Sequence, residues 1–323
     1  MNSDFRALFP GAQEQVYLNI AAKGLVSTTV RDVVASYMDD CIAGTTDKDL
    51  LREQVDETRA VFAAMIGAEA DEIAITKNVS EGLNLFAASL DWAEGDNVVV
   101  CPELEHPNNI YLWYNLEQRF GIQVKAIHPE DGHMPVEAMA EAIDERTRVV
   151  TFPTISFAPG FVTDIAPIVR AAKAVGALTL ADGAQSIGSV ATDVHSLGID
   201  AVAVATQKCL LSVYGFGFLY VRREVAETLV PIHVARYGIH LDGHETAYTA
   251  GPLEYAAGAR RFDIGNYNYL GMSATRASLE LLSGLGVENI QAHTHGLAAR
   301  LATGLLGLGL PVVGGEPGPH LAH

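Results

Sequence analysis

Short apolar runs, separated by longer amphipathic stretches, dominate the first two thirds of the chain. The stretches NNIYLWYNLEQRF and DIAPIVRAAKAVG are typical of the helix-like segments between the runs. Strands that alternate with helices in this way predict an α/β fold with a doubly wound, mostly parallel sheet of seven strands. The seven runs are DEIAIT (71–76), NVVVCP (97–102), QVKAIHP (123–129), RVVTFPTI (148–155), ALTLAD (177–182), AVAVAT (201–206) and GFGFLYV (215–221).

The pattern differs at both ends of this region. The run at 215–221 follows its predecessor too closely for a helical crossover, so we expect one antiparallel strand. A helix from about Thr46 to Ile66 precedes the first run, and the pattern beyond about residue 240 is helical again. We therefore expect a large domain over 18–240 and a smaller α+β domain formed by 1–17 plus 241–323. An earlier helix, with its cap at Ser27, Thr28 or Thr29, has an apolar stripe of Val30, Val33, Val34, Met38 and Cys41.

Composition excludes several classes of function. The 323 residues carry 39 acidic against 21 basic side chains, a formal charge of −18, and such a surface repels nucleic acid. The apolar stretch 201–221 approaches the length of a membrane span. However, Gln207, Lys208, Gly215 and Gly217 divide it into two short strands, so we expect no membrane association.

The N-terminus lacks the basic start and apolar core of a signal peptide. Three cysteines, Cys41, Cys101 and Cys209, are an odd number without metal-like spacing. We therefore expect a cytoplasmic protein and no metal site.

Ligands of an open parallel sheet bind beyond the carboxyl ends of its strands. After DEIAIT, the amides of a helix start at Val79 and Ser80 can bind an anion, although Ser80 can also be a helix cap alone. After NVVVCP comes His106, which is either a solvated loop residue or a flat ring that stacks on an aromatic ligand.

Two charged residues follow the next apolar runs. Asp182 ends ALTLAD, where it either caps the following segment or holds a cationic ligand atom. Lys208 follows AVAVAT and is the only charge in 201–221, so it is either a surface lysine or an amine kept nucleophilic toward aldehydes by apolar surroundings. An anion site, a flat ring, a carboxylate and an amine together match what pyridoxal phosphate requires.

Longer stretches of the chain resemble the class V aminotransferase and cysteine desulfurase family of fold-type I pyridoxal phosphate enzymes. The spacing of 26 positions between the Asp of DGAQ and Lys208 is the most specific feature of this resemblance. The matching stretches span roughly residues 17 to 295 and are NVSEGLN, ELEHPNN, ADGAQSIG, DVHSLGIDAVAVATQK, YGFGFLYV and ARRFDIGNYN.

The resemblance implies roles for individual residues. Lys208 would form a Schiff base with the cofactor and move protons at the substrate α-carbon, while Asp182 would pair with the ring nitrogen. Gln185 would hydrogen-bond the phenolic oxygen, His106 would stack on the ring, and the turn at Val79 and Ser80 would hold the phosphate. In this family the sites lie at a homodimer interface, so the turn 265–268 would reach the neighbouring subunit's phosphate pocket.

The chain also departs from the family pattern. Ala205-Thr206-Gln207-Lys208 replaces the usual Ser-x-His-Lys, so Thr206 or Gln207 would supply the missing phosphate donor. Asn266 occupies the position of a usual threonine and can still donate through its amide. The strand-rich C-terminal portion that usually supplies a carboxylate-binding arginine and a mobile cysteine is not found. Asn19, Arg260 and Arg261 are the substrate-binding candidates, and both arginines are equally candidates for interface or structural roles.

We therefore expect a homodimeric pyridoxal phosphate enzyme acting on a small amino acid, with aminotransferase or cysteine desulfurase-like chemistry. C–S lyase and epimerase reactions remain open because they start from the same α-carbanion. A non-catalytic binding module that has kept the fold is the alternative from another class.

Overall fold

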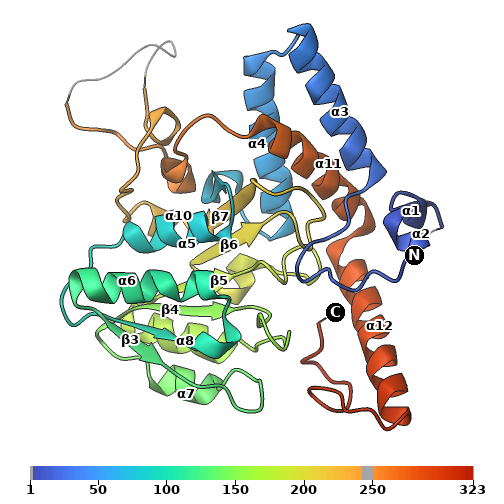
Figure 1. Ribbon diagram of the computed structural model, residues 1–323. Coiled ribbons are helices and arrows are strands. Elements are labelled where there is room, and N and C mark those ends of the chain that lie inside the picture. Colours follow the sequence, from blue (N-terminus) through green and yellow to red (C-terminus); the bar gives the residue numbers. More distant parts are fainter. Residues whose placement is uncertain (1–2, 242–250, 323) are drawn as a thin grey trace. The chain divides into compact units, whose positions relative to one another are not determined.

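The computed structural model in Figure 1 describes residues 3–241 and 251–322. The chain forms two compact units. The first unit comprises Met1–Leu90 and Val204–Leu281, and the second comprises Asp91–Ala203 and Leu282–His323. The expected division into a large domain over 18–240 and a small one formed by the remaining residues stays a prediction.

Seven strands of the described chain form one sheet in the order β1-β7-β6-β5-β4-β2-β3. β7 pairs antiparallel with β1, whereas the pairs β2–β3, β2–β4, β4–β5 and β5–β6 are parallel. The prediction of a mostly parallel sheet with one antiparallel strand is therefore confirmed. The strands are β1 (Ile73–Thr76), β2 (Asn97–Val100), β3 (Gln123–Ala126), β4 (Thr147–Pro153), β5 (Leu178–Asp182), β6 (Ala201–Ala205) and β7 (Gly217–Val221).

Position in the sheet explains the composition of the strands. All five residues of β6, AVAVA, are buried, because an interior parallel strand is covered on both faces. β3, with the sequence QVKA, has no fully buried residue and forms one edge of the sheet. A charged side chain at such an edge discourages pairing with another chain.

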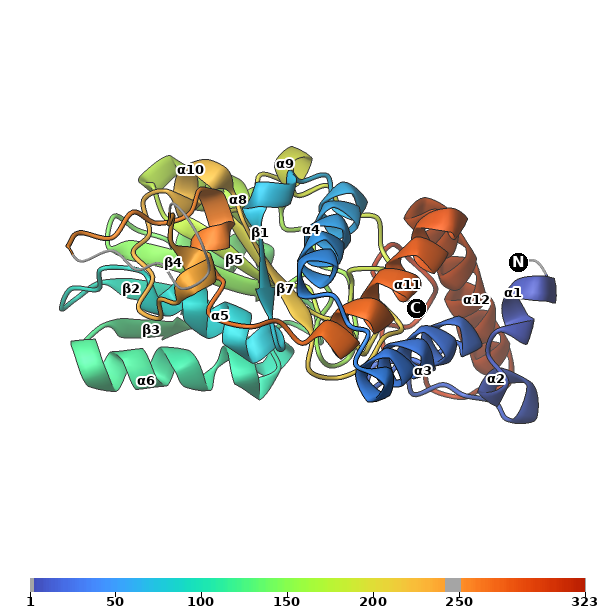
Figure 2. The same cartoon turned by 90° about the horizontal axis from the view of Figure 1, so that it is seen from above.

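Two long helices of the first unit begin at polar caps. α3 (Thr28–Ala43) is capped by Ser27, which accepts a hydrogen bond from the Val30 amide, and α4 (Lys48–Met65) is capped by Asp47. α3 lies beside α11 in Figures 1 and 2, where Val30 packs against Ala274 and Ala277. The remaining α-helices of this unit are α1 (Ser3–Ala7), α2 (Gly11–Glu14), α5 (Val79–Ala88), α10 (Arg223–Ala226) and most of α11 (Tyr269–Leu285).

Helices of the second unit cover its strands from both sides. Figure 2 shows α6 (Tyr111–Phe120) on one face of β2, β4 and β5 and α8 (Ala166–Val175) on the other. α8 ends at Gly176, whose φ of +78° terminates the helix in the left-handed conformation that glycine tolerates. The other α-helices of this unit are α7 (Val136–Glu141), α9 (Val194–Leu197) and α12 (Val287–Gly307).

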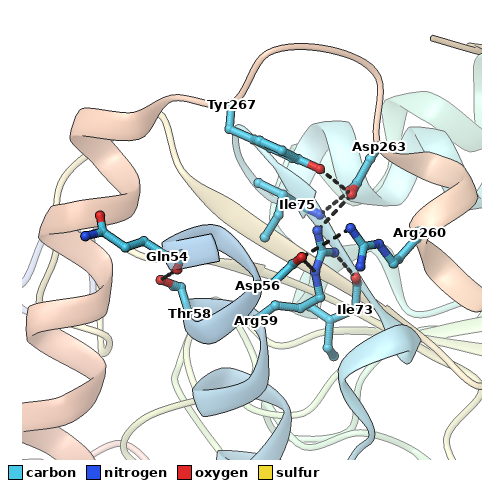
Figure 3. A network of polar contacts seen from close by, with 9 residues as sticks. All are labelled: Gln54, Asp56, Thr58, Arg59, Ile73, Ile75, Arg260, Asp263 and Tyr267. Carbon is cyan, nitrogen blue, oxygen red and sulfur yellow. Dashed lines mark hydrogen bonds and ion pairs between the residues drawn. The ribbon is translucent and has the colours of Figure 1, made fainter. Parts of the chain in front are cut away.

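A buried ion pair joins three segments of the first unit (Figure 3). Arg59 of α4 is 1% exposed and Asp263 is fully buried, with 2.8 Å between the Arg59 Nη2 and Asp263 Oδ2 atoms. Arg59 also donates to the carbonyl of Ile73, and Asp263 accepts from the Ile75 amide at 2.8 Å. Burial opposes the charge of Arg59, but its carboxylate partners outweigh this cost and raise its pKa. The pair thus fastens α4 and the chain at residue 263 to β1.

The same ion pair holds the start of the turn that contains GNYN. The Tyr267 hydroxyl donates to Asp263 Oδ2 at 2.9 Å, and burial together with the nearby carboxylate raises the pKa of Tyr267. Asp56 completes the cluster through contacts with Arg59 at 3.5 Å and Arg260 at 3.2 Å (Figure 3). Residues 263–267 are therefore tied to the interior of the first unit.

Within residues 3–241 and 251–322, none of the helices combines the length and apolarity that crossing a membrane requires.

We predict that Arg59→Met lowers the chemical unfolding midpoint strongly, at a cost of roughly 3–5 kcal/mol, because it leaves the Asp263 charge buried without its partner. Arg31→Met is the control, since Arg31 forms an ion pair with Asp32 whose side chains are 68% and 64% exposed, and it should leave the midpoint nearly unchanged. Equal midpoints for both variants in urea would contradict a structural role for the buried pair.

Candidate functional site

The loop that carries Lys208 is held by its own backbone and by Thr206. The Thr206 hydroxyl lies 2.9 Å from the carbonyl oxygen of Phe216 and 3.0 Å from that of Val213. The Leu211 amide donates to the Lys208 carbonyl, and the Ser212 amide donates to the Thr206 carbonyl, both at 2.9 Å. These bonds close the turn on both sides of Lys208, so its backbone has a defined position at the end of β6.

Helix α11 supports the same loop from outside. Ser278 donates to the Leu210 carbonyl at 2.5 Å, and the hydroxyls of Ser212 and Thr275 lie 3.0 Å apart. Leu211 takes a φ of +52°, an uncommon value for a leucine that these contacts maintain. The Lys208 side chain is half-buried beside the buried Cys209 and Leu210.

The segment before α3 lies directly against Lys208. The Gly24 amide donates to the Gln207 carbonyl at 2.8 Å. A Cβ atom on Gly24 would collide with the Lys208 carbonyl oxygen and would lie 2.7 Å from Leu211 Cδ2. Asn19, in the same segment, is exposed. The sequence did not indicate the role of Gly24, because no local pattern predicts a close contact with the Lys208 backbone, 184 positions along the chain.

The N-terminus of α5 differs from the sequence interpretation in one respect. The cap is Asn78, whose side chain accepts from the Glu81 amide at 2.9 Å, so the interpretation of Ser80 as the cap is wrong. Asn78 has the extended backbone that a cap requires, whereas Ser80 already lies in the first helical turn. Val79 and Ser80 thus place their amides at the positive end of a helix of ten residues.

The turn 265–268 is oriented by residues that the sequence did not single out. The Tyr237 hydroxyl donates to Asn266 Oδ1 at 3.1 Å and accepts from Arg52 Nη2 at 3.1 Å. With its oxygen engaged, the exposed Asn266 amide has its nitrogen left as a donor. Asn268 donates to the Gly215 carbonyl at 3.0 Å and closes the other end of the turn.

Both candidate arginines have partners inside the first unit. Arg261 is buried, donates to the carbonyls of Gly258 and Leu229, and has its pKa lowered by burial. Arg260 forms an ion pair with Asp56 and is 40% exposed. Of the two guanidinium groups, that of Arg260 is the more accessible to a ligand.

In the second unit, Asp182 is the last residue of β5 and pairs with Pro153 of β4 and Ala203 of β6. Its side chain is 7% exposed and accepts from the Ala184 amide at 2.9 Å. Gln185, which is 6% exposed, follows in a turn rather than a helix, so Asp182 does not cap a helix.

His106 follows the neighbouring strand β2 in the same unit. Its ring meets Phe157 edge to face, with ring centroids 4.8 Å apart, and its Nδ1 atom accepts from the Asn108 amide at 3.2 Å. The Phe157 amide donates to the Leu104 carbonyl at 2.8 Å, which ties the residues after β2 to those after β4. Glu105, directly before His106, is buried and was not singled out by the sequence analysis.

Each unit therefore has candidate residues of its own. The first contains Lys208 with Thr206 and Gln207, the amides of Val79 and Ser80, and the Asn266 amide; the second contains Asp182, Gln185 and His106. Such groups can hold an anion, a cationic ring atom and an electrophilic carbon. Among the described residues, no three His, Cys, Asp or Glu side chains gather as a metal ion requires.

The chain is similar to known proteins over most of its length. The family model Aminotransferase class-V matches residues 16–319. A protein named probable cysteine desulfurase from Methanothermobacter thermautotrophicus is 35% identical over 296 residues, which cover 90% of this chain and 72% of that protein.

Solved structures share the fold. The apo structure of cysteine desulfurase from Thermococcus onnurineus NA1 superposes with a TM-score of 0.83 at 27% identity, covering 96% of this chain and 78% of that one. A variant of C-DES with glycine covalently linked to its PLP cofactor has a TM-score of 0.84 at 23% identity, covering 93% and 80% of the two chains.

We predict that Gly24→Ala displaces the Lys208 loop, because the new Cβ meets backbone and not a flexible side chain. Hydrogen exchange of the Leu211 and Ser212 amides should accelerate, and the thermal midpoint should fall. Gly11→Ala is the control, since its Cβ would make an ordinary contact 3.5 Å from Leu25. Unchanged exchange in Gly24→Ala would contradict the close packing of this segment on Lys208.

Proposed function

Because the chain belongs to the class-V aminotransferase family, we propose that it is a pyridoxal phosphate-dependent enzyme that acts on a small amino acid. The proposed chemistry is of the aminotransferase or cysteine desulfurase-like kind. The observation that carries the proposal is the placement of two residues. Asp182 ends β5, Lys208 is the third residue after β6, and these two strands pair in parallel.

The residues present fit pyridoxal phosphate. The cofactor needs a donor-rich pocket for its phosphate, a carboxylate for its ring nitrogen and an amine for its aldehyde. The chain offers the amides at the start of α5, the buried Asp182 and the half-buried Lys208. When bound, pyridoxal phosphate supplies an aldehyde that takes up amines and a ring that accepts electrons from the substrate α-carbon.

Lys208 and Asp182 have complementary tasks. Lys208 Nζ would hold the aldehyde carbon until the substrate amine displaces it, and the freed amine would then take and return the proton at the substrate α-carbon. The hydrogen-bonded loop 206–212 would hold its backbone in one position for both tasks. Asp182 would keep a proton on the ring nitrogen. Its burial would strengthen this ionic hydrogen bond, since little water competes for the carboxylate.

The remaining residues would orient the cofactor. His106 would stack on the ring, and Gln185 would donate to the phenolic oxygen. The amides of Val79 and Ser80 would hold the phosphate. Because the Thr206 hydroxyl directs its proton at main-chain carbonyls, Gln207 is the better replacement for the missing serine donor.

Cysteine chemistry is limited by the positions of the thiols. Cys101 and Cys209 are buried, and burial raises the pKa of Cys101 to about 12. Neither can present a thiolate to a substrate. Cys41 is exposed on α3. The similarity to cysteine desulfurases therefore supports cysteine-like substrates more directly than it supports a persulfide-carrying residue among these three.

We also propose a cytoplasmic homodimer with shared active sites. Exposed apolar side chains in the first unit support association, among them Val16 at 86%, Leu18 at 76% and Ile42 at 82%. The exposed Asn266 amide, oriented by Tyr237, would then serve the phosphate pocket of the second subunit.

We predict that the purified protein with added pyridoxal phosphate gains an absorbance band near the visible edge. The band should shift with one member of a panel of L- and D-amino acids. Lys208→Ala should lose borohydride-reducible attachment and reduce turnover by roughly 10²–10⁴-fold, the usual contribution of a positioned acid–base group. Asp182→Asn should keep the cofactor but lose most α-carbon chemistry, because a neutral ring is a poorer electron sink.

Lys173→Ala is the matched control for these variants, since Lys173 is exposed on α8. It should behave as the unmodified protein does. A cofactor still reducible onto Lys208→Ala, or full turnover by Asp182→Asn, would contradict the assigned roles. A protein that binds pyridoxal phosphate but turns over no amino acid would instead be a binding module.

Shared sites predict complementation between two inactive variants. Lys208→Ala and Asn266→Ala should each have low activity alone. Refolded together, they form heterodimers in which one site combines an intact Lys208 with the intact Asn266 of the other subunit. Activity should therefore return on mixing. A mixture no more active than the average of its components would contradict the sharing of sites.

A further inference from the structure

Glu105 is a buried acidic residue for which the proposed reaction has no role. Its side chain is 3% exposed, and its Oε1 atom accepts a hydrogen bond from Asn109 Nδ2 at 2.8 Å. Its Oε2 atom is buried without a hydrogen-bond partner among the described residues. A carboxylate in such a place would have one donor for two charged oxygens, which is far from the compensation that a buried charge requires.

The hydrogen-bond partner of Glu105 belongs to a rigid network. The Asn109 amide nitrogen also donates to Thr151 Oγ1 of β4 at 2.8 Å, and the Asn109 oxygen accepts from Trp113 Nε1 of α6 at 3.3 Å. Asn109 and Trp113 are fully buried. Asn109 therefore fastens one end of the turn 105–109 to β4 and α6, and its bond to the Glu105 side chain ties the other end of the turn, next to His106, to the same anchor.

The charged groups around Glu105 oppose its ionisation. Asp182 of β5 is the charged group that acts on it most directly, and burial followed by repulsion from Asp182 raises the pKa of Glu105 well above its ordinary value, against the Asn109 hydrogen bond. Cys101 is a further titratable group near Glu105, and its pKa is raised by burial first and then by the acidic side chains of Glu103 and Glu105. Two carboxyl groups that repel each other in this way favour a state with one proton between them.

We propose that Glu105 is a positioning residue, held as the neutral acid beside Asp182, that fixes the His106 turn and leaves Asp182 as the single negative charge of the pair. One negative charge would balance the one positive charge of a protonated pyridoxal phosphate ring nitrogen. This inference rests on the proposed function for the role of Asp182, but the protonation of Glu105 can be tested without any cofactor.

The first test is the pH dependence of stability. An acid whose pKa is raised by folding binds its proton more tightly in the folded state, so the folded protein loses stability as the pH rises above the ordinary value of 4.5. Glu105→Gln keeps the shape and the acceptor for Asn109 but does not titrate. We compare the melting temperature of Glu105→Gln with that of the unmodified protein at each pH. The difference should shift in favour of Glu105→Gln by roughly 3 °C or more from pH 5 to pH 8.

Glu103→Gln, in the preceding turn Pro102–Leu104, is the matched control. Burial raises the pKa of Glu103, but the hydrogen bond with His128 and the other favourable contacts of this carboxylate together lower it by more. Glu103→Gln should therefore not gain stability relative to the unmodified protein as the pH rises. When Asp182→Asn is also present, the pH-dependent gain in melting temperature from Glu105→Gln should be smaller. Repulsion from Asp182 is then absent, and only burial raises the pKa of Glu105. Parallel pH curves for Glu105→Gln and the unmodified protein, or an undiminished gain in the Asp182→Asn background, would overturn the proposal.

The second test concerns positioning. Glu105→Ala removes the acceptor for Asn109, so it should weaken pyridoxal phosphate binding by about tenfold, equivalent to 1.4 kcal/mol, and reduce the circular dichroism of the bound cofactor. Glu105→Gln should restore both to within about threefold of the unmodified protein. Failure of this rescue would contradict a neutral positioning role. If the unmodified protein binds no pyridoxal phosphate, the proposed function fails, while the pH series still decides the state of Glu105.

Discussion

Parallel pairing of strands is the constraint on which the rest of this structure depends. In β2, β4, β5 and β6 it brings all carboxyl ends to one edge of the sheet. The chain places its unusual polar residues directly after these ends, with His106 after β2 and Asp182 at the end of β5. The interior strands can be almost entirely apolar because the candidate polar residues lie at or beyond the carboxyl ends of the strands.

Buried charge is treated in two different ways. Arg59 and Asp263 form an ion pair in which each charge has a partner and further hydrogen bonds, so the pair can hold α4, β1 and residues 263–267 together. Glu105 lies near another acid, and a neutral carboxyl group is the state in which its burial costs least. The first arrangement supports the scaffold, whereas the second, by our proposal, sets the charge of the site.

The position of Lys208 illustrates how a reactive side chain is presented. The contacts that hold its loop come from Thr206, from Gly24 and, on α11, from Thr275 and Ser278. A backbone held by these contacts gives the side chain a fixed point of attachment, which suits the binding and proton-transfer role that we propose for Lys208.

The amino-acid sequence by itself determined the seven strands, the antiparallel direction of β7 and the family, because apolar periodicity and the spacing of Asp182 and Lys208 are local or one-dimensional features. It misassigned the cap of α5, since Asn78 and Ser80 are both good caps and only the backbone geometry distinguishes them. Gly24, Tyr237 and Glu105 emerged only from the tertiary structure. Their importance lies in contacts with residues distant in the chain or in burial that no local pattern encodes: a glycine beside the Lys208 carbonyl, a hydroxyl on Asn266, and a carboxyl group enclosed near Asp182.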